Sequence, residues 1–428
     1  MTTPNNKSWY FRNWRWFVLG TLFLSTFLSY FDRQVLGTAI DPIAKEFGLN
    51  NIQIGKLLAA FLLSYGWMHL IIGVVTDRIR NIRYFFPFMV LGWSISTFLV
   101  GFVDNFSTLM WLRYLLGIWE AINFPICIML ISRIFPPRER SLAVGIFASG
   151  AFLATLAAPP FVIYLSNNFD WRYSFILAGT IGSLWIIPWL LIFRKPQEKV
   201  ENWNLYYQSE KSSFTSLKQI VINLFKDYIQ VLKAPGFWGV VFIGIGIIPS
   251  LYFASLWFPR FFTQALHVPY DQTLSVRLSM IYFMQDAGLW IGGFLVMVIA
   301  KKGFSILKSR KVVITIAFLM MLTILLVPYM KSVTTTVIVL CVYVFGIGAF
   351  WGNQHAFKQD VVKGKVATVA ALVGFIEMNF TSLVIKRIGF MTNETGNFNS
   401  VFLVMGVLAF FAFIATFIFI RSKWVVIE

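Results

Sequence analysis

The chain has 428 residues, of which 58% are hydrophobic and only 13% are charged. A soluble domain of this size does not need so much apolar surface, so apolar runs broken by short polar loops indicate a protein that uses lipid as its solvent. The formal net charge of +18 would suit nucleic-acid binding, but the basic residues lie between apolar runs rather than along one stripe. The composition therefore argues against nucleic acid as a partner and indicates an integral membrane protein.

Cysteine and histidine are too scarce to build a cofactor or metal site. Cys127 and Cys341 are the only cysteines and both lie inside apolar runs, and the chain has three histidines. This excludes a disulfide framework and a metal cluster, and we expect no cofactor and no enzyme active site. The first 16 residues carry Lys7, Arg12 and Arg15, and no small-residue cleavage site follows the first apolar run. We expect a retained helix there, not a signal peptide.

Twelve apolar runs are long enough to span a bilayer core, which takes about 20 helical residues. The predicted spans are 17–40, 52–76, 84–103, 107–133, 141–165, 172–194, 236–262, 274–300, 311–330, 334–357, 364–385 and 400–421. The polar segment at 195–235 reads as a linker. The prediction is an all-α membrane protein with 12 transmembrane helices in two six-helix bundles, at 17–194 and 236–421, with terminal segments at 1–16 and 422–428.

Loop charge predicts the orientation of these helices. The loops after the odd-numbered spans hold few basic residues, such as Lys45, Arg172 and Lys331, with Lys386 and Arg387 as one close pair. The loops after the even-numbered spans are basic and hold Arg78, Arg80, Arg83, Arg133, Arg138, Arg140, Arg194, Lys195, Lys199, Lys301, Lys302, Lys308, Arg310, Lys311, Lys358, Lys363 and Lys365. By the positive-inside rule, both termini and the linker lie in the cytosol.

A weak internal repeat supports two related halves. The stretch FPPRERSLAVGIF at 135–147 leads into the fifth span, and DVVKGKVATVAAL at 360–372 leads into the eleventh. Arg140 corresponds to Lys365, and a run of small residues continues into both helices, where it lets helices approach closely. Parallel six-helix repeats of this kind build carriers that work by rocking one half against the other.

Several charged residues lie well inside the predicted spans, where each costs about 2.5–3.5 kcal/mol on insertion scales. They are Asp32, Arg33, Glu120, Asp286 and Glu377. One interpretation is a water-accessible cavity in which an arginine binds an anion and a carboxylate takes up a proton, because guanidinium pairs well with carboxylate. Structural ion pairs between helices are the alternative for all five, and explain Asp286 and Glu377 equally well.

Two further pairs share helix faces. Arg113 precedes Glu120 by seven residues, close to two helical turns, and Tyr65 precedes His69 by four. We expect Tyr65 to line the cavity. We interpret His69 as a packing or hydrogen-bonding histidine.

The loop after the second span, GVVTDRIRNIR at 73–83, resembles the signature loop of the major facilitator superfamily. Asp77 and Arg78 match its Asp-Arg pair. Arg83 supplies a basic charge one position after the place that the signature loop gives to its basic residues. The resemblance implies a cytosolic charge latch, to which we assign Asp77, Arg78, Arg83 and Arg140. A merely basic cytosolic loop is the alternative.

The N-terminal half is similar to the anion:cation symporter family, which includes hexuronate and galactonate permeases, sialin and the vesicular glutamate transporters. The resemblance implies that Arg33 binds substrate and that Asp32 and Glu120 couple protons, with Tyr65 and Arg113 contacting substrate or tuning the coupling carboxylate. It rests on YFDRQVLGTAIDPIAKEFGLN (30–50), SYGWMHLIIGVVTDR (64–78), RYLLGIWEAINFP (113–125) and FPPRERSLAVGIF (135–147).

The C-terminal half matches less closely. The segment DAGLWIGG at 286–293 resembles the sugar-acid permease branch, and Asp286 is assigned to proton coupling there. The tenth and eleventh spans are unusually polar, and we expect Asn353, Gln354 and Glu377 to contact substrate. These departures favour a cargo other than a standard hexuronate.

The predicted function is import of a small organic anion, such as a sugar acid or carboxylate, with protons, by alternating access. The alternatives are a proton-driven exporter, or an importer of an amino acid, a carboxylate siderophore or a drug. A channel fits less well, because single buried charges in two repeated halves suit occlusion. The expected partners are the anion, H⁺ and the lipid of a bacterial inner membrane, with the protein acting as a monomer.

Overall fold

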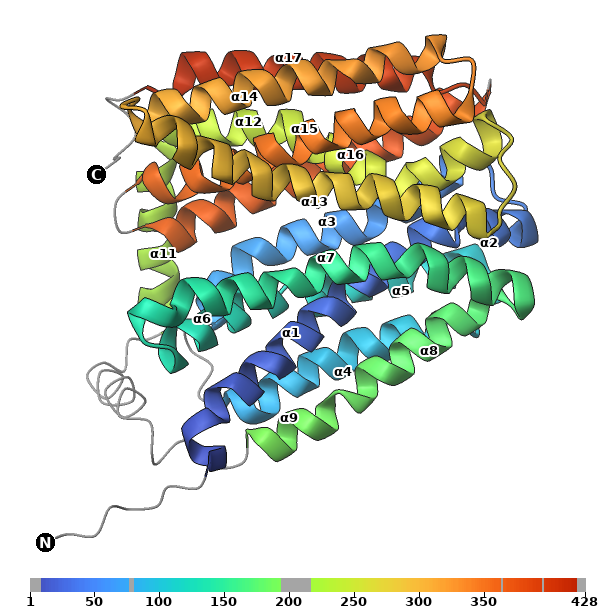
Figure 1. Ribbon diagram of the computed structural model, residues 1–428. Coiled ribbons are helices and arrows are strands. Elements are labelled where there is room, and N and C mark those ends of the chain that lie inside the picture. Colours follow the sequence, from blue (N-terminus) through green and yellow to red (C-terminus); the bar gives the residue numbers. More distant parts are fainter. Residues whose placement is uncertain (1–8, 77–80, 194–216, 363–364, 395, 422–428) are drawn as a thin grey trace, which may run out of the picture.

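The protein is a bundle of long helices that lie side by side and run roughly along one direction (Figure 1). The computed structural model describes residues 9–76, 81–193, 217–362, 365–394 and 396–421, and the elements in that part are all helical. The first half holds α1 (Trp9–Thr38), α2 (Ile40–Phe47), α3 (Asn51–Thr76), α4 (Ile82–Val100), α5 (Phe106–Glu120), α6 (Asn123–Ile134), α7 (Pro137–Asn168), α8 (Trp171–Leu184) and α9 (Ile186–Ile192).

The second half follows the same plan. It holds α11 (Leu217–Leu232), α12 (Pro235–Arg260), the π-helix η1 (Phe261–Ala265), α13 (Gln272–Lys301), α14 (Ile306–Met321), the 3₁₀-helix η2 (Leu322–Tyr329), α15 (Val333–Asp360), α16 (Val366–Asn393) and α17 (Asn399–Phe419). In Figure 1 the first half lies below and the second half above. We call the end where α1 begins and α17 ends the termini end, and the end that carries α2 and η1 the far end.

Eleven segments of the described residues are long and apolar enough to cross a membrane, four of which join two helical elements each: α5 with α6, α8 with α9, α12 with η1 and α14 with η2. The helix α1 is the twelfth. Its 30 residues extend about 45 Å at 1.5 Å per residue, and it packs among the others (Figure 1). It is less apolar because it contains Arg12, Arg15, Asp32 and Arg33. The prediction of twelve membrane helices in two bundles is confirmed.

Prolines explain two interruptions within the spans. A proline removes a backbone donor and clashes with the carbonyl four residues earlier. Pro125 acts on the carbonyl of Ala121 in this way, and the chain leaves the helix at 121–122, between α5 and α6. Pro188 acts on Leu184, where α8 ends. The first interruption follows directly after Glu120.

The two halves meet along α3 and α16, α7 and α13, and α1 and α12. Small residues allow this approach: a Cβ at Gly55 would lie 2.9 Å from the Lys386 carbonyl oxygen and 3.1 Å from the Cα of Gly389. Because both positions are glycine, α3 and α16 pack backbone against backbone. The interface is therefore close enough for polar groups on the two halves to meet directly.

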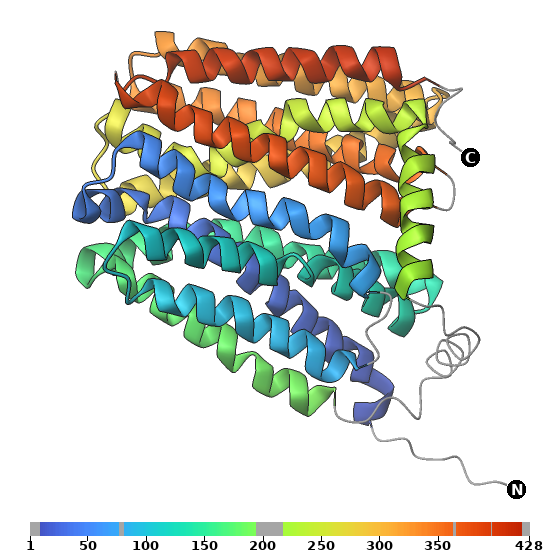
Figure 2. The ribbon, with the colours of Figure 1, turned by 180° about the vertical axis from the view of Figure 1, so that it is seen from behind.

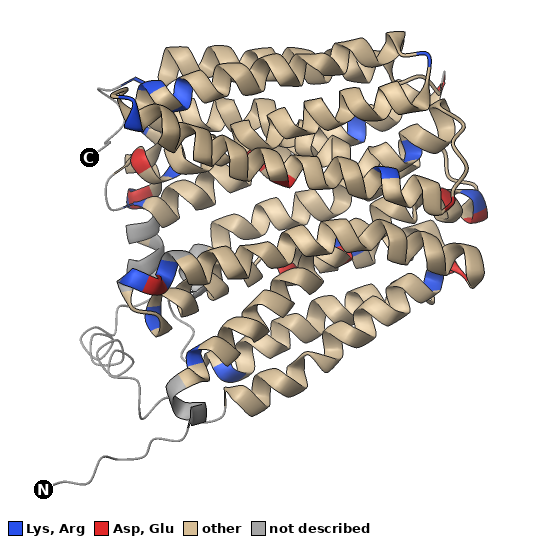
Figure 3. Ribbon diagram, in the orientation of Figure 1, with Lys and Arg blue, Asp and Glu red and all other residues tan. Residues whose placement is uncertain are grey.

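The outer surface suits lipid. Large apolar side chains face outward on several helices, including Phe88 (59% exposed), Phe294 (58%) and Phe410 (54%). Figure 3 shows charged residues gathered at the two ends of the bundle, with few along its length. This distribution, with the eleven apolar spans, is that of an integral membrane protein.

Part of the predicted linker is helical. The helix α11 runs across the other helices at the termini end (Figure 2). The Tyr228 hydroxyl donates to the Leu70 carbonyl at 2.9 Å, and Asp227 pairs with Lys365 at 2.6 Å. Through these contacts α11 is tied to α3 of the first half and to the start of α16 in the second.

Candidate functional site

An arginine and a glutamate from two helices of the first half form a buried ion pair. Arg33 on α1 donates from Nε to Oε2 of Glu120 on α5 at 2.7 Å. The Glu120 side chain is fully buried and that of Arg33 is 12% exposed. The structure thus brings together the two residues that the sequence placed in one cavity.

Aromatic rings surround the Arg33 guanidinium. Its central carbon lies 4.6 Å from the ring centroids of both Tyr30 and Tyr65, and 5.1 Å from that of Phe61. The Nη2 atom donates to the Ser29 hydroxyl at 3.3 Å. Cation–π contacts of this kind stabilise a guanidinium that has lost most of its water. They also hold its plane while leaving part of its hydrogen-bonding edge for another partner.

Two more charged residues complete this group. Arg113 is 3% exposed and stacks over Phe61 at 5.6 Å, while Asp32 is 1% exposed and lies beside Thr97 of α4. Within the described part of the chain, Asp32 Oδ1, Glu120 Oε1 and Arg113 Nε have no hydrogen-bond partner. Buried polar atoms are seldom left unpaired, since each costs about 1–3 kcal/mol. Two cations and two carboxylates with spare hydrogen-bonding atoms form a site suited to a proton or a polar ligand.

The second half faces this group with Tyr252 and Asp286. The charge of Arg33 acts on Tyr252 of α12, and that of Asp286 on α13 acts on Tyr30. The site therefore lies between the halves. Tyr252 was not predicted. Its signal in the sequence is a tyrosine at mid-depth in the first span of the second half.

The predicted substrate contacts Asn353, Gln354 and Glu377 lie inside the second half. Gln354 donates to Oε1 of Glu377, and Lys358 Nζ donates to Oε2 at 2.9 Å. Asn353 donates to the Ala349 carbonyl at 2.9 Å. Counting Lys358 among the loop charges was wrong: it belongs to α15, and its side chain is only 11% exposed because it reaches inward to Glu377.

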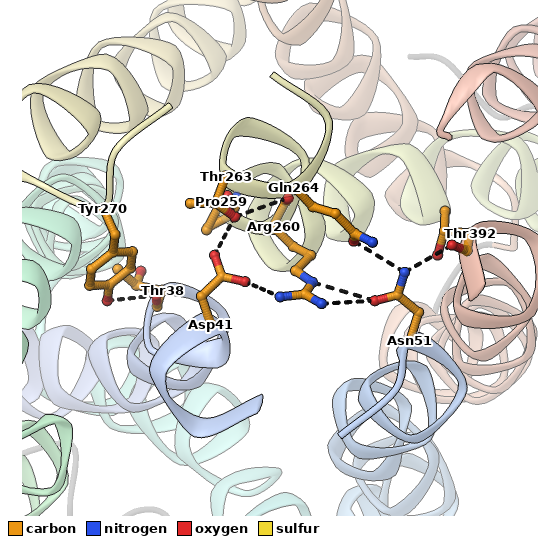
Figure 4. Close-up of polar contacts among 9 residues, drawn as sticks. All are labelled: Thr38, Asp41, Asn51, Pro259, Arg260, Thr263, Gln264, Tyr270 and Thr392. Atoms are coloured by element: carbon orange, nitrogen blue, oxygen red, sulfur yellow. Dashed lines mark hydrogen bonds and ion pairs between the residues drawn. The ribbon is translucent and has the colours of Figure 1, made fainter. Parts of the chain in front are cut away.

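A polar network joins the halves at the far end (Figure 4). Asp41, in the first turn of α2, accepts from Arg260 Nη1 at 2.6 Å and from the Thr263 hydroxyl at 2.5 Å. The π-helix η1 starts directly after Arg260 and so positions Thr263. Tyr270 adds a bond from its hydroxyl to the Thr38 carbonyl at 2.9 Å. We call Asp41, Arg260, Thr263 and Asn51 the far-end network.

Asn51, at the start of α3, extends the network to a third helix of the second half. Its Oδ1 accepts from Arg260, and its Nδ2 donates to Gln264 at 3.1 Å and to the Thr392 carbonyl at 3.0 Å. Asn51 is 4% exposed. These bonds tie α2 and α3 to α12, η1 and α16, and so hold the two halves together at this end. This network was not predicted, because Asp41 and Asn51 lie outside the predicted spans.

Of the four residues predicted to form a latch, the structure describes two, Arg83 and Arg140. Asp77 and Arg78 lie outside the described residues. Arg140 donates from Nε to the Phe135 carbonyl at 3.0 Å, and the Arg83 guanidinium stacks on Tyr84 at 5.2 Å. The latch remains a prediction.

Two helical halves that meet around buried, partly unsatisfied charges define a membrane carrier. Residues 22–384 match the model of the Major Facilitator Superfamily, and the chain belongs to this superfamily. Its members are transporters rather than enzymes, and the resemblance predicted from the sequence is confirmed.

Curated relatives cover 80% of the chain or more. A D-galactonate transporter of Escherichia coli is 27% identical over 80% of this chain and 79% of its own length. A hexuronate transporter of Bacillus subtilis is 27% identical over 94% of this chain and 93% of its own. A hexuronate transporter of Escherichia coli strain K12 is 23% identical over 92% and 91%.

Solved structures share the fold. A bacterial homologue of the human lysosomal transporter Spinster, in an inward-facing and unoccupied conformation, has a TM-score of 0.72 at 20% identity, covering 95% of this chain and 98% of that one. The xylose transporter of Escherichia coli, in a partially occluded inward-open conformation, has a TM-score of 0.72 at 14% identity, covering 96% and 99%.

Proposed function

We propose that this protein is a proton-coupled symporter that imports a sugar acid, or a closely related small organic anion, by alternating access. The observation that carries the proposal is the buried pair of Arg33 and Glu120, surrounded by aromatic rings and placed where the two halves meet. A fixed cation next to a titratable carboxylate is the minimum that anion and proton binding at one site requires.

The geometry suggests how anion and proton binding are linked. Arg33 uses Nε for Glu120, so the carboxylate occupies part of the guanidinium edge that a substrate carboxylate needs. When Glu120 takes up a proton its charge is lost, and Arg33 then offers parallel N–H donors to the anion. Asp32, one residue before Arg33, supplies a second carboxylate whose charge also acts on Arg113. Binding the anion and binding the proton therefore favour each other.

Coupling to protons supplies the driving force. An anion moving inward alone is opposed by a membrane potential that is negative inside, at about 2.3 kcal/mol per charge per 100 mV. If more protons than anionic charges move together, the complex is net positive and the potential favours accumulation. Asp32, Glu120 and Asp286 are the carboxylates proposed to carry these protons.

We assign the termini end to the cytosol of a bacterial inner membrane, because the basic loops gather there. The far-end network then closes the periplasmic side. Alternating access requires Asp41 and Asn51 to separate from Arg260 when the carrier opens outward. In this arrangement we expect the Arg33 site to open toward the termini end.

The proposed substrate class follows from the site and from the relatives together. The transporters of D-galactonate and hexuronate named above carry sugars that bear one carboxylate. Arg33 suits that carboxylate, and the hydroxyls of Tyr30, Tyr65 and Tyr252 suit the hydroxyl groups of a sugar acid.

The proposal is tested with purified protein in liposomes loaded with one compound, by counterflow of its radiolabelled form. At least one of D-galactonate and D-glucuronate should exchange, and xylose, which lacks the carboxylate, should not. Exchange of xylose, or of neither sugar acid, would contradict the proposal.

A further inference from the structure

A second buried pair of a base and a carboxylate lies in the second half, and the mechanism above does not use it. Glu377 on α16 is 1% exposed and accepts from Lys358 and Gln354 of α15. The Oε1 atom of Gln354, itself fully buried, has no hydrogen-bond partner within the described residues. The cluster is thus built around a carboxylate and retains an unused polar atom.

The backbone of α12 is shaped around this carboxylate. A Cβ at Gly244 would collide with the Oε1, Cδ and Cγ atoms of Glu377. Because only a glycine leaves this slot, the Glu377 carboxylate is held where α12, α15 and α16 converge. These are three of the six spans of the second half, and α12 also carries Tyr252 of the Arg33 site.

A chain of side chains connects this pair with the Arg33 site. The Arg33 guanidinium lies over Tyr65 at 4.6 Å, and the Tyr65 ring meets the His69 ring at 4.8 Å. His69 packs against Gly374 of α16, one turn before Glu377, and the charges of both Arg33 and Lys358 act on it. His69 therefore lies between the two pairs, at the junction of the halves.

The cluster of Lys358 and Glu377, with His69 beside it, lies toward the termini end of the bundle. Lys358 is two residues before the end of α15, and His69 is seven before the end of α3, both at the termini end. An anion that leaves Arg33 for that end would meet the imidazole of His69 and the ammonium of Lys358.

A purely structural role explains the pair poorly. Apolar residues of similar volume usually stabilise a protein interior as well as a buried ion pair does, or better. In a membrane helix the cost of burying charge adds to this. Lysine also differs from arginine here: its ammonium is a compact charge with three donors, of which Glu377 takes one.

We propose that His69, Lys358 and Glu377 form a second binding station, which receives the carboxylate of the substrate on its way from Arg33 to the termini end. The station rests on the proposed function, because it needs an anion to receive. When Glu377 is charged, its carboxylate balances the positive charge of Lys358, and the station does not bind anions. When Glu377 takes up one proton, Lys358 keeps its positive charge and binds the substrate carboxylate, and release of that proton expels the anion.

The groups that face Glu377 are consistent with this cycle. From α15 they are Gln354 and Lys358, with His355 turned against Trp351 at 4.8 Å between ring centroids. From α12 the Val240 carbonyl accepts from Gln354 at 3.5 Å. From α3 the titratable group is His69. Lys358 is the group among these that carries a fixed positive charge next to Glu377.

The test compares the two faces of the membrane. The half-saturation concentration for D-galactonate is measured in right-side-out and in inverted vesicles, for the wild type and for Lys358→Met/Glu377→Gln. We expect a rise of at least tenfold on the cytosolic side and less than twofold on the opposite side. The single variant Lys358→Arg keeps both the positive charge and Glu377. Its half-saturation concentration on the cytosolic side should stay within about threefold of the wild type. The matched control is Asp227→Asn/Lys365→Gln, which removes a partly exposed pair at the same end and should leave both values within twofold.

The outcomes separate the two proposals. A wild type that moves neither D-galactonate nor D-glucuronate overturns the proposed function and this inference with it. A functional wild type whose double variant changes equally on both sides, or on neither, overturns the station and leaves the function standing. If the double variant does not fold, His69→Phe should give the same one-sided loss, and an unchanged cytosolic value in His69→Phe would then overturn the station.

Discussion

Asp41 and Arg260 are 219 positions apart in the sequence, and their side chains meet at 2.6 Å. The pair joins α2 of the first half to the end of α12 in the second, with side chains 13% and 20% exposed. Because the two residues belong to different halves, any motion that parts the halves at the far end must break this bond. The far-end network is therefore the part of the structure that most directly reports the conformation of the carrier.

Replacing Asp41 with asparagine should open the far end more often. A hydrogen bond to a charged group contributes about 1.5–3 kcal/mol, so the open population should rise about tenfold. Ser255→Cys, beside Gly37 of α1, is the reporter, in a chain whose buried Cys127 and Cys341 are replaced by alanine. The measurement is its rate of reaction with a membrane-impermeant maleimide.

Asp271→Asn is the control for this experiment. Asp271 lies at the same end but caps α13 by accepting from Thr273 and Leu274 of its own half. Its substitution should leave the labelling rate within twofold. An equal rise in both variants, or none with Asp41→Asn, would show that the network does not hold the far end closed.

Replacing Arg33 with lysine should weaken substrate binding although the charge is kept. Lysine cannot present two parallel donors to a carboxylate, so the half-saturation concentration for D-galactonate should rise tenfold or more. Arg15→Lys is the control on the same helix, because Arg15 pairs with Glu139 at 3.0 Å with both side chains about a third exposed. It should change the value less than twofold. Equal effects of the two substitutions would argue against a binding role for Arg33.

Adding a methyl group at Gly244 should destabilise the protein by about 1–3 kcal/mol, because the new Cβ overlaps the Glu377 carboxylate. The same change at Gly293 of α13 meets nothing within 4 Å. Thermal unfolding of the detergent-solubilised protein should therefore show a lower Tm for Gly244→Ala and an unchanged Tm for Gly293→Ala. A Gly244→Ala protein as stable as the wild type would mean that Glu377 does not occupy this slot.

Glu46 should make stability depend on pH. Arg172 donates to both of its oxygens at 2.6 and 2.8 Å, and this bonding, with a further bond from Trp171, holds the pKa of Glu46 below its ordinary value. A lowered pKa adds stability above the ordinary glutamate value of about 4.3, and this is lost as the pH falls through the pKa of the folded state.

Glu46→Gln tests this linkage. Because the Glu46 side chain is 40% exposed, the loss at pH 7 should stay under about 1 kcal/mol. The Tm difference from the wild type should shrink toward zero as the pH is lowered to about 3. A difference that stays constant down to that pH would contradict the role assigned to Arg172.

The sequence predicts the spans well because each one carries its own signal. The predicted span 274–300 corresponds to α13 (Gln272–Lys301), and 334–357 to α15 (Val333–Asp360). Lipid demands a long apolar run for every helix, so length and hydropathy suffice without knowledge of neighbours. Pro125 is a sequence signal for the helix break after Glu120. It does not suffice to predict the break, because many membrane helices tolerate a proline.

The pairing of charges was only partly predictable. Asp32, Arg33 and Glu120 were found because a charge inside an apolar run is costly wherever its partner lies. Lys358 was misplaced because a lysine near a helix end reads as a loop charge, and only the fold shows its side chain turning inward to Glu377. Asp41 and Arg260 each look like ordinary end-of-helix charges, so their contact depends on how the halves are placed.

The central claim, that Glu120 couples the anion to protons, is tested most directly by comparing two modes of transport in Glu120→Gln. Glutamine keeps the shape of the protonated acid but cannot release a proton. We predict that counterflow of D-galactonate continues at a rate within about tenfold of the wild type. Accumulation driven by an inward proton gradient, and the accompanying acidification of the lumen, should be lost. Accumulation in Glu120→Gln that matches the wild type and still responds to the proton gradient would contradict the account.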